Sequence, residues 1–118
     1  MPPKPVHKRG DVILVFFHHS DLRNAKLCPA LVVQADNFQT ELPQVIIAMI
    51  TSRLFRVNDP SRVIVPRFSS EGLQSGLLTD TVVMTDNLAT IAESEIDRMI
   101  GTLPMANIDK ALRHTLGL

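Results

Sequence analysis

The short apolar runs of this chain constrain its fold more than any other feature. Runs of four to eight residues, rich in β-branched side chains, are typical of β-strands. The runs lie at residues 11–17, 30–34, 44–51, 62–65 and 80–84, with a shorter one at 89–91. Because two of them, 30–34 and 44–51, are almost continuously apolar, we expect strands buried on both faces. The fourth run ends at Pro66, and a proline is not expected in a central strand.

After residue 92 the apolar spacing changes to a helical one. Ile96, Met99 and Ile100 share one face at this spacing, and Gly101 can end the helix, so a helix is predicted over 93–100. Pro104 opens a second helix with an apolar stripe from Met105 to Leu116. Five or six strands followed by helices give an α+β fold, mainly β, with a small barrel or half-barrel and a C-terminal helix pair.

Chain length limits the number of domains. With 118 residues, 45% of them apolar, the chain can bury one core. We therefore expect a disordered N-terminal tip over 1–7 and a single domain over 8–118. One cysteine fits a reducing compartment, and no run approaches the roughly 18 apolar residues of a spanning helix. The chain is predicted to be cytoplasmic, without a membrane partner.

The charge of the chain is unevenly distributed although its net charge is zero. Residues 1–67 hold nine Lys and Arg against five Asp and Glu, whereas 68–118 hold three against seven. A zero net charge argues against a strongly basic, nonspecific nucleic-acid binder. The positive half could still receive a phosphodiester backbone.

Several short motifs occur in a recognisable order. They are Arg9-Gly10-Asp11-Val12, Ser20-Asp21-Leu22, Pro29-Ala30-Leu31-Val32-Val33, Ile50-Thr51-Ser52, Gly72-Leu73, Asp80-Thr81-Val82-Val83 and Ile100-Gly101-Thr102-Leu103. In this order the chain resembles the MazF/PemK family of bacterial toxin ribonucleases. The resemblance implies an SH3-like barrel, related to that of CcdB and Kid, and a growth-inhibiting toxin of a type II toxin–antitoxin system. It also implies a homodimer, single-stranded RNA and an antitoxin as partners, and no cofactor or metal.

The resemblance also assigns catalytic candidates. In this family the ribose 2′-hydroxyl attacks the adjacent phosphate, which requires a proton acceptor, a proton donor and groups that stabilise the dianion. Thr51 matches the family threonine, whereas Cys28 stands where an arginine is usual. A thiol cannot make the charged, bidentate contact of an arginine. Lys26 is the nearest cation that could replace it, and Asp86 matches an aspartate of plasmid-borne relatives.

Two further positions, Met84 and Ala89, also lack arginines found in relatives. Three loops are expected between the strands, at 18–26, 52–61 and 67–79. The RNA-binding candidates are polar and cationic residues of the first two loops, among them a histidine that can titrate near neutrality. They are His19, Arg23, Ser52, Arg53 and Arg56. Because these expected arginines are absent, a second function stays open. The protein could be a toxin-fold binding module without nuclease activity, which poisons a target, as CcdB poisons DNA gyrase, or binds an antitoxin. A barrel without toxicity is a third.

Overall fold

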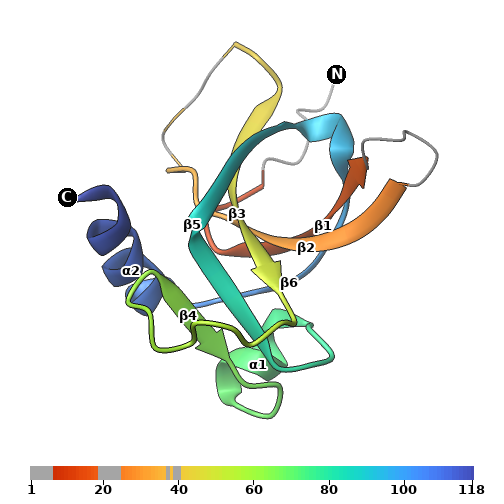
Figure 1. The fold of residues 1–118 in the computed structure, drawn as a ribbon. Helices are drawn as coiled ribbons and strands as arrows, with labels where there is room; N and C mark the ends of the chain where they lie inside the picture. Colours follow the sequence, from red (N-terminus) through yellow and green to blue (C-terminus); the bar gives the residue numbers. More distant parts are fainter. Residues whose placement is uncertain (1–6, 19–24, 37, 39–40) are drawn as a thin grey trace.

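One antiparallel sheet of six strands forms the body of the protein in the computed structural model, which describes residues 7–18, 25–36, 38 and 41–118. The strands are β1 (Asp11–His18), β2 (Ala25–Val32), β3 (Gln44–Thr51), β4 (Arg62–Val65), β5 (Thr81–Ala92) and β6 (Ile96–Thr102). Their order in the sheet is β4-β5-β3-β2-β1-β6, so β4 and β6 are the edges and the curved sheet stays open (Figure 1). The predicted mainly-β, small-barrel fold is confirmed, and Pro66 directly follows an edge strand.

The sheet is apolar on both faces, which explains the continuous apolar runs in the sequence. The inner face carries a buried cluster that consists of Ile13, Val15, Ala30, Val32, Val45 and Ile47. On the opposite face, Leu31, Ala48 and Val83 pack against Ile108 and Leu112 of α2 (Ala106–Leu116). We call these the inner face and the α2 face. Figure 1 shows α2 outside the curved sheet, beside β5.

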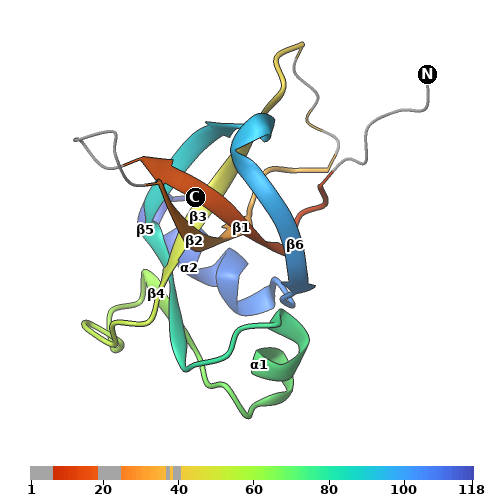
Figure 2. The same cartoon turned by 90° about the vertical axis from the view of Figure 1, so that its right-hand side faces the viewer.

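The strand β5 contains a bulge near its middle. Ala48 of β3 is opposite Leu88, but the next residue, Met49, is opposite Met84. Residues 85–87 therefore have no partner on β3, which makes this an enlarged β-bulge. The runs at 80–84 and 89–91, expected as two strands, are joined by this bulge into one. From its end, the chain turns through η1 (Glu93–Glu95) into β6 (Figure 2).

The prediction of a helix over 93–100 is wrong, because this segment forms η1 and β6, and β6 pairs with β1. Two register shifts explain the misleading pattern. Ile13 is opposite Met99 while Val12 is opposite Gly101, and a second shift separates Arg98 from Ile96. The extra residues at 97 and 100 interrupt the two-residue alternation of a strand and produce a spacing close to that of a helix. The predicted C-terminal helix pair is reduced to α2.

A short helix, α1 (Ser70–Ser75), lies within the range 67–79 that was expected to be a loop. The Ser69 side chain accepts a hydrogen bond from the Gly72 N–H at 3.0 Å, and Gly76 ends the helix with φ of 76°. The helix packs closely on β6, since a Cβ atom on Gly101 would lie 2.4 Å from the Ser75 backbone. No helix in the described part of the chain is long and apolar enough to cross a membrane.

Candidate functional site

A cavity of about 440 Å³ lies where the last residues of β3 meet the first half of β2. Its lining combines cations, hydroxyl groups, a thiol, an amide and apolar side chains. The lining residues are Lys26, Leu27, Cys28, Pro29, Met49, Ile50, Thr51, Ser52, Arg53, Leu77, Thr79, Thr81, Met84 and Asn87. Five of the predicted site residues, Lys26, Cys28, Thr51, Ser52 and Arg53, are therefore brought together.

Strand pairing explains why Cys28 and Thr51 meet. Ala30 of β2 is opposite Met49 of β3 in an antiparallel pair. When this register is continued by two residues, toward the start of β2 and the end of β3, Cys28 lies opposite Thr51. Opposed residues point to the same face of a sheet, so both side chains are on the inner face, at its open end. Cys28 and Thr51 are half-buried, whereas Lys26 and Arg53 are exposed.

Hydrogen bonding at Thr51 leaves its hydroxyl available as a donor. The Thr51 Oγ1 atom accepts a hydrogen bond from the backbone N–H of Arg53 at 3.1 Å. A hydroxyl carries one proton and two acceptor lone pairs, so this contact uses acceptor capacity alone. The same contact holds Arg53 close to the cavity. The site can thus offer a hydroxyl proton and two positive charges to an anion.

Other residues of the cavity were missed by sequence reasoning, apart from Met84, which was noted as a position without an arginine found in relatives. Met49 and Met84 are opposite each other on β3 and β5, and together with Leu77 they give the cavity apolar walls. Asn87 reaches it from the bulge, and Thr79 from the segment before β5. The pairing of β3 with β5 depends on the bulge, and no residue pattern in the sequence indicates that bulge. Nothing in the sequence therefore indicated that Asn87 would line the cavity.

Asp86 and Arg56, two predicted site residues, belong to a separate ion-pair cluster. The Asp86 carboxylate lies 3.2 Å from the Arg56 guanidinium and 3.4 Å from that of Arg62. Neither Asp86 nor Arg56 lines the cavity. The structure therefore does not bring Asp86 together with Thr51, and its described contacts are those of an anchor for the loop between β3 and β4.

The same loop is braced by Asp59. Its carboxylate accepts hydrogen bonds from the Ser61 hydroxyl at 2.7 Å, the Ser61 N–H at 2.9 Å and the Arg56 guanidinium at 2.7 Å. These donors, Ser61 first, hold the pKa of Asp59 well below its usual range, and Asp59 in turn raises the pKa of Arg56. Arg56 adopts a left-handed backbone conformation, φ 57°, which is uncommon outside glycine.

Two predicted RNA-binding residues, His19 and Arg23, lie outside the described residues, as do residues 1–6 of the predicted disordered tip. Over residues 7–18, 25–36, 38 and 41–118, no three His, Cys, Asp or Glu side chains come close enough to hold a metal ion.

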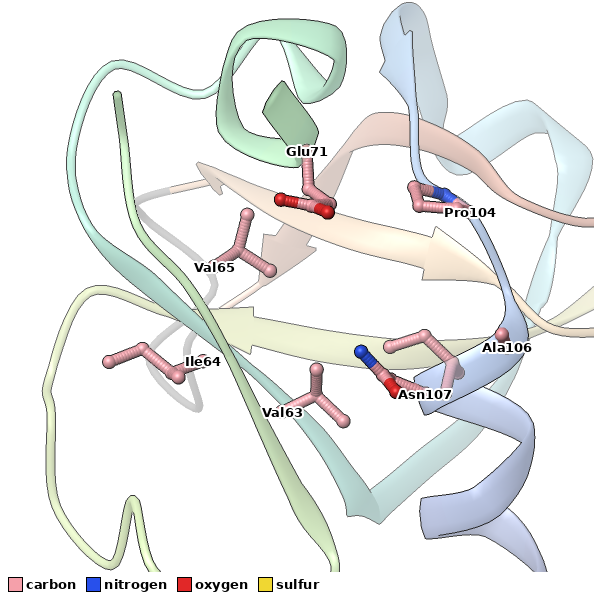
Figure 3. A pocket seen from close by; sticks show the side chains of 8 residues that line it. Val63, Ile64, Val65, Glu71, Pro104, Ala106 and Asn107 are labelled. Carbon is pink, nitrogen blue, oxygen red and sulfur yellow. The ribbon is translucent and has the colours of Figure 1, made fainter. Parts of the chain in front are cut away.

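A second cavity, of about 320 Å³, lies on the α2 face between β4, α1 and the start of α2 (Figure 3). Glu71 and Asn107 are its polar lining residues, beside Val63, Val65 and Pro104. Since none of the predicted site residues lines it, the cavity with Cys28 and Thr51 is the candidate site.

The fold and this cavity define a small, mainly-β protein whose open sheet presents cations and hydroxyls in one hollow at its end. A family model described as PemK-like, MazF-like toxin of type II toxin-antitoxin system matches residues 8–116. The chain belongs to this family, which confirms the resemblance found in the sequence and favours it over the CcdB-like alternative. No curated protein sequence matches the chain.

Solved structures agree with this assignment. An endoribonuclease from a mycobacterial species, in complex with its cognate antitoxin, is 25% identical with a TM-score of 0.72, covering 96% of this chain and 97% of that one. A second mycobacterial endoribonuclease is 24% identical with a TM-score of 0.70, over 97% and 94% of the two chains. MazE–MazF from Deinococcus radiodurans matches over 98% and 99%, with 18% identity and a TM-score of 0.74. The last two likenesses concern the fold.

Proposed function

We propose that this toxin is an endoribonuclease that cleaves single-stranded RNA through attack of a ribose 2′-hydroxyl, without a metal ion. The observation that carries the proposal is the meeting of Thr51, Lys26 and Arg53 in one cavity. A mycobacterial relative of similar fold is an endoribonuclease. In this chemistry the 2′-oxygen bonds to phosphorus and the 5′-oxygen leaves, giving a 2′,3′-cyclic phosphate and a 5′-hydroxyl.

The residues of the cavity can stabilise the charge that develops in this step. The phosphorane carries two negative charges, and donors aimed at such charge supply a large part of catalysis. Lys26 and Arg53 provide positive charge, and the Thr51 hydroxyl donates to a non-bridging oxygen. Cys28 supplies a weak donor where relatives have an arginine, so the cationic set is reduced and slower cleavage is expected.

We further propose that the protein works in the cytoplasm as a homodimer that an antitoxin holds inactive. Antitoxin binding is supported by family membership and by the complexes of similar toxins. Large apolar side chains near α1 and the β3–β4 loop remain exposed and are available for protein contacts. Examples are Phe55, Phe68, Leu73 and Leu78, at 67%, 79%, 71% and 75% exposure.

The test is incubation of purified, antitoxin-free protein with mixed-sequence RNA in the presence of a chelator. Cuts that carry a 2′,3′-cyclic phosphate are expected, and Thr51→Ala should slow cleavage at least tenfold. Thr90→Ala is the matched control, because Thr90 is an exposed strand threonine of β5 that does not line the cavity. Intact RNA at high protein concentration would refute the nuclease, and growth arrest with intact RNA would favour the binding module.

A further inference from the structure

The bulge of β5 places three consecutive side chains in three different environments. In a regular strand, neighbouring side chains point to opposite faces. Met84 is opposite Met49 on the inner face, while Leu88 packs with the cluster on the α2 face. Four steps along the strand separate these two residues, so the alternation is broken between them. A bulge can therefore direct Asp86 and Asn87 to the same side of the sheet.

Two of the three bulge residues are held firmly. Thr85 is fully buried, and its hydroxyl bonds to the Ser61 carbonyl and, at 2.7 Å, to the Thr115 hydroxyl of α2. Its backbone N–H donates to the same Ser61 carbonyl at 3.1 Å. Asp86 is paired with Arg56 and Arg62. These contacts fix the backbone on the N-terminal side of Asn87, and the pairing of Leu88 with Ala48 fixes the other side.

Asn87 is then presented at the rim of the candidate site with its amide unused. The residue is exposed and lines the cavity with Cys28 and Thr51. Among the described residues, its side chain is not part of any hydrogen bond or ion pair. A polar side chain on a rigid backbone, beside an apolar wall of Met49, Met84 and Leu77, has the arrangement of a base-recognition site.

We propose that Asn87 is a specificity-determining residue that reads an adenine of the RNA substrate; this inference rests on the proposed function. The amide presents a donor and an acceptor side by side, which match the N7 acceptor and N6 donor of adenine. Bases of single-stranded RNA can leave the stack and expose this edge. The methionine side chains contact the face of the base, where a thioether packs well against an aromatic ring.

The test measures binding separately from cleavage. A short uridine oligomer built from 2′-fluoro nucleotides lacks the attacking hydroxyl, and a single adenine is moved along it one position at a time. We expect one adenine position to raise affinity at least fivefold for the wild-type protein. Asn87→Ala should remove this gain, so that the adenine-containing and all-uridine oligomers bind the variant with equal affinity. Asn87→Asp, which loses the donor, should reduce the gain as well.

Asn107→Ala is the matched control, because Asn107 is an exposed asparagine that lines the cavity on the other face of the sheet (Figure 3). It should retain the adenine preference, and equal melting temperatures would show that all variants fold. Absence of binding, absence of an adenine preference in the wild type, or an unchanged preference in Asn87→Ala would each overturn the inference. An Asn87-dependent preference without RNA cleavage would preserve it and refute the nuclease instead.

Discussion

Replacing Cys28 by arginine should restore the missing half of the cationic site. Cys28 is half-buried and faces a cavity of about 440 Å³, so a longer side chain can extend into open space without displacing the core. The guanidinium would then lie near Thr51, Lys26 and Arg53. It would add a permanent charge and a bidentate donor to the place where the phosphate is expected to bind.

The size of the gain follows from the surroundings of the site. A donor aimed at a developing oxyanion in a dry site contributes about 2.7 to 4 kcal/mol, or 10²- to 10³-fold in rate. Here the cavity is open to solvent, which weakens each charge, and two cations already line it. We therefore expect Cys28→Arg to raise the cleavage rate at least tenfold and to remain below the upper end of that range.

The assay is single-turnover cleavage of mixed-sequence RNA by the purified wild type, Cys28→Arg and the double variant Cys28→Arg/Thr51→Ala. The double variant should lose the gain, because the arginine and the threonine are expected to act on the same phosphate. If Cys28→Arg melts at the wild-type temperature and shows no gain in cleavage rate, positive charge at this position does not limit the reaction.

Three further changes test other parts of the molecule. Because Asp86 braces a loop, Asp86→Asn should lower the cleavage rate a few-fold and lower the free energy of unfolding, measured by urea titration, by about 1 kcal/mol. The pH–rate profile should not shift. Loss of the acidic limb of that profile would instead indicate acid–base catalysis. The hydrogen bonds that lower the pKa of Asp59 stabilise the fold at pH values above the ordinary aspartate pKa of about 3.9. This stabilisation is lost as the pH falls below that value. The melting temperatures of wild type and Asp59→Asn should therefore differ at pH 7 and converge in acid. Gly101→Ala should destabilise the fold more than Gly117→Ala, since the added Cβ would press on the backbone of α1. At position 117, where φ is 70° and the surroundings are open, an alanine would incur only about 1 kcal/mol of backbone strain. Equal losses of stability by calorimetry would contradict the close packing.

The strands were predictable because their apolar runs are short, β-branched and bounded by turns. The segment 96–102 was not, since two extra residues relative to β1 give its apolar side chains a spacing close to that of a helix. Helix α1 was missed, although Ser69 and Gly76 are ordinary start and stop residues, because its six residues form less than two turns. Local patterns identify elements well and pairing irregularities poorly.

The candidate site, too, was predictable only in part. Cys28 and Thr51 could be placed because Thr51 belongs to a motif shared with a known family, Cys28 directly precedes another such motif, and both lie in predicted or observed strands. Asp86 was expected to act with them, yet it pairs with arginines, because the bulge of β5 turns its carboxylate toward Arg56 and Arg62. The contribution of Asn87 depends on the same bulge, and the number of unpaired residues between two strands is a tertiary property.

The pairing of the first strand with the last has a consequence for how this toxin folds. Val12 is opposite Gly101, so all six strands must be synthesised before β1 acquires its second neighbour. Contacts between residues so distant in sequence are formed against a large loop-closure entropy, and proteins rich in them fold slowly. During synthesis, β6 leaves the ribosome after β1 to β5. The edge of β1 that pairs with β6 therefore stays open until β6 has emerged, and the sheet is completed only after the other five strands have been synthesised.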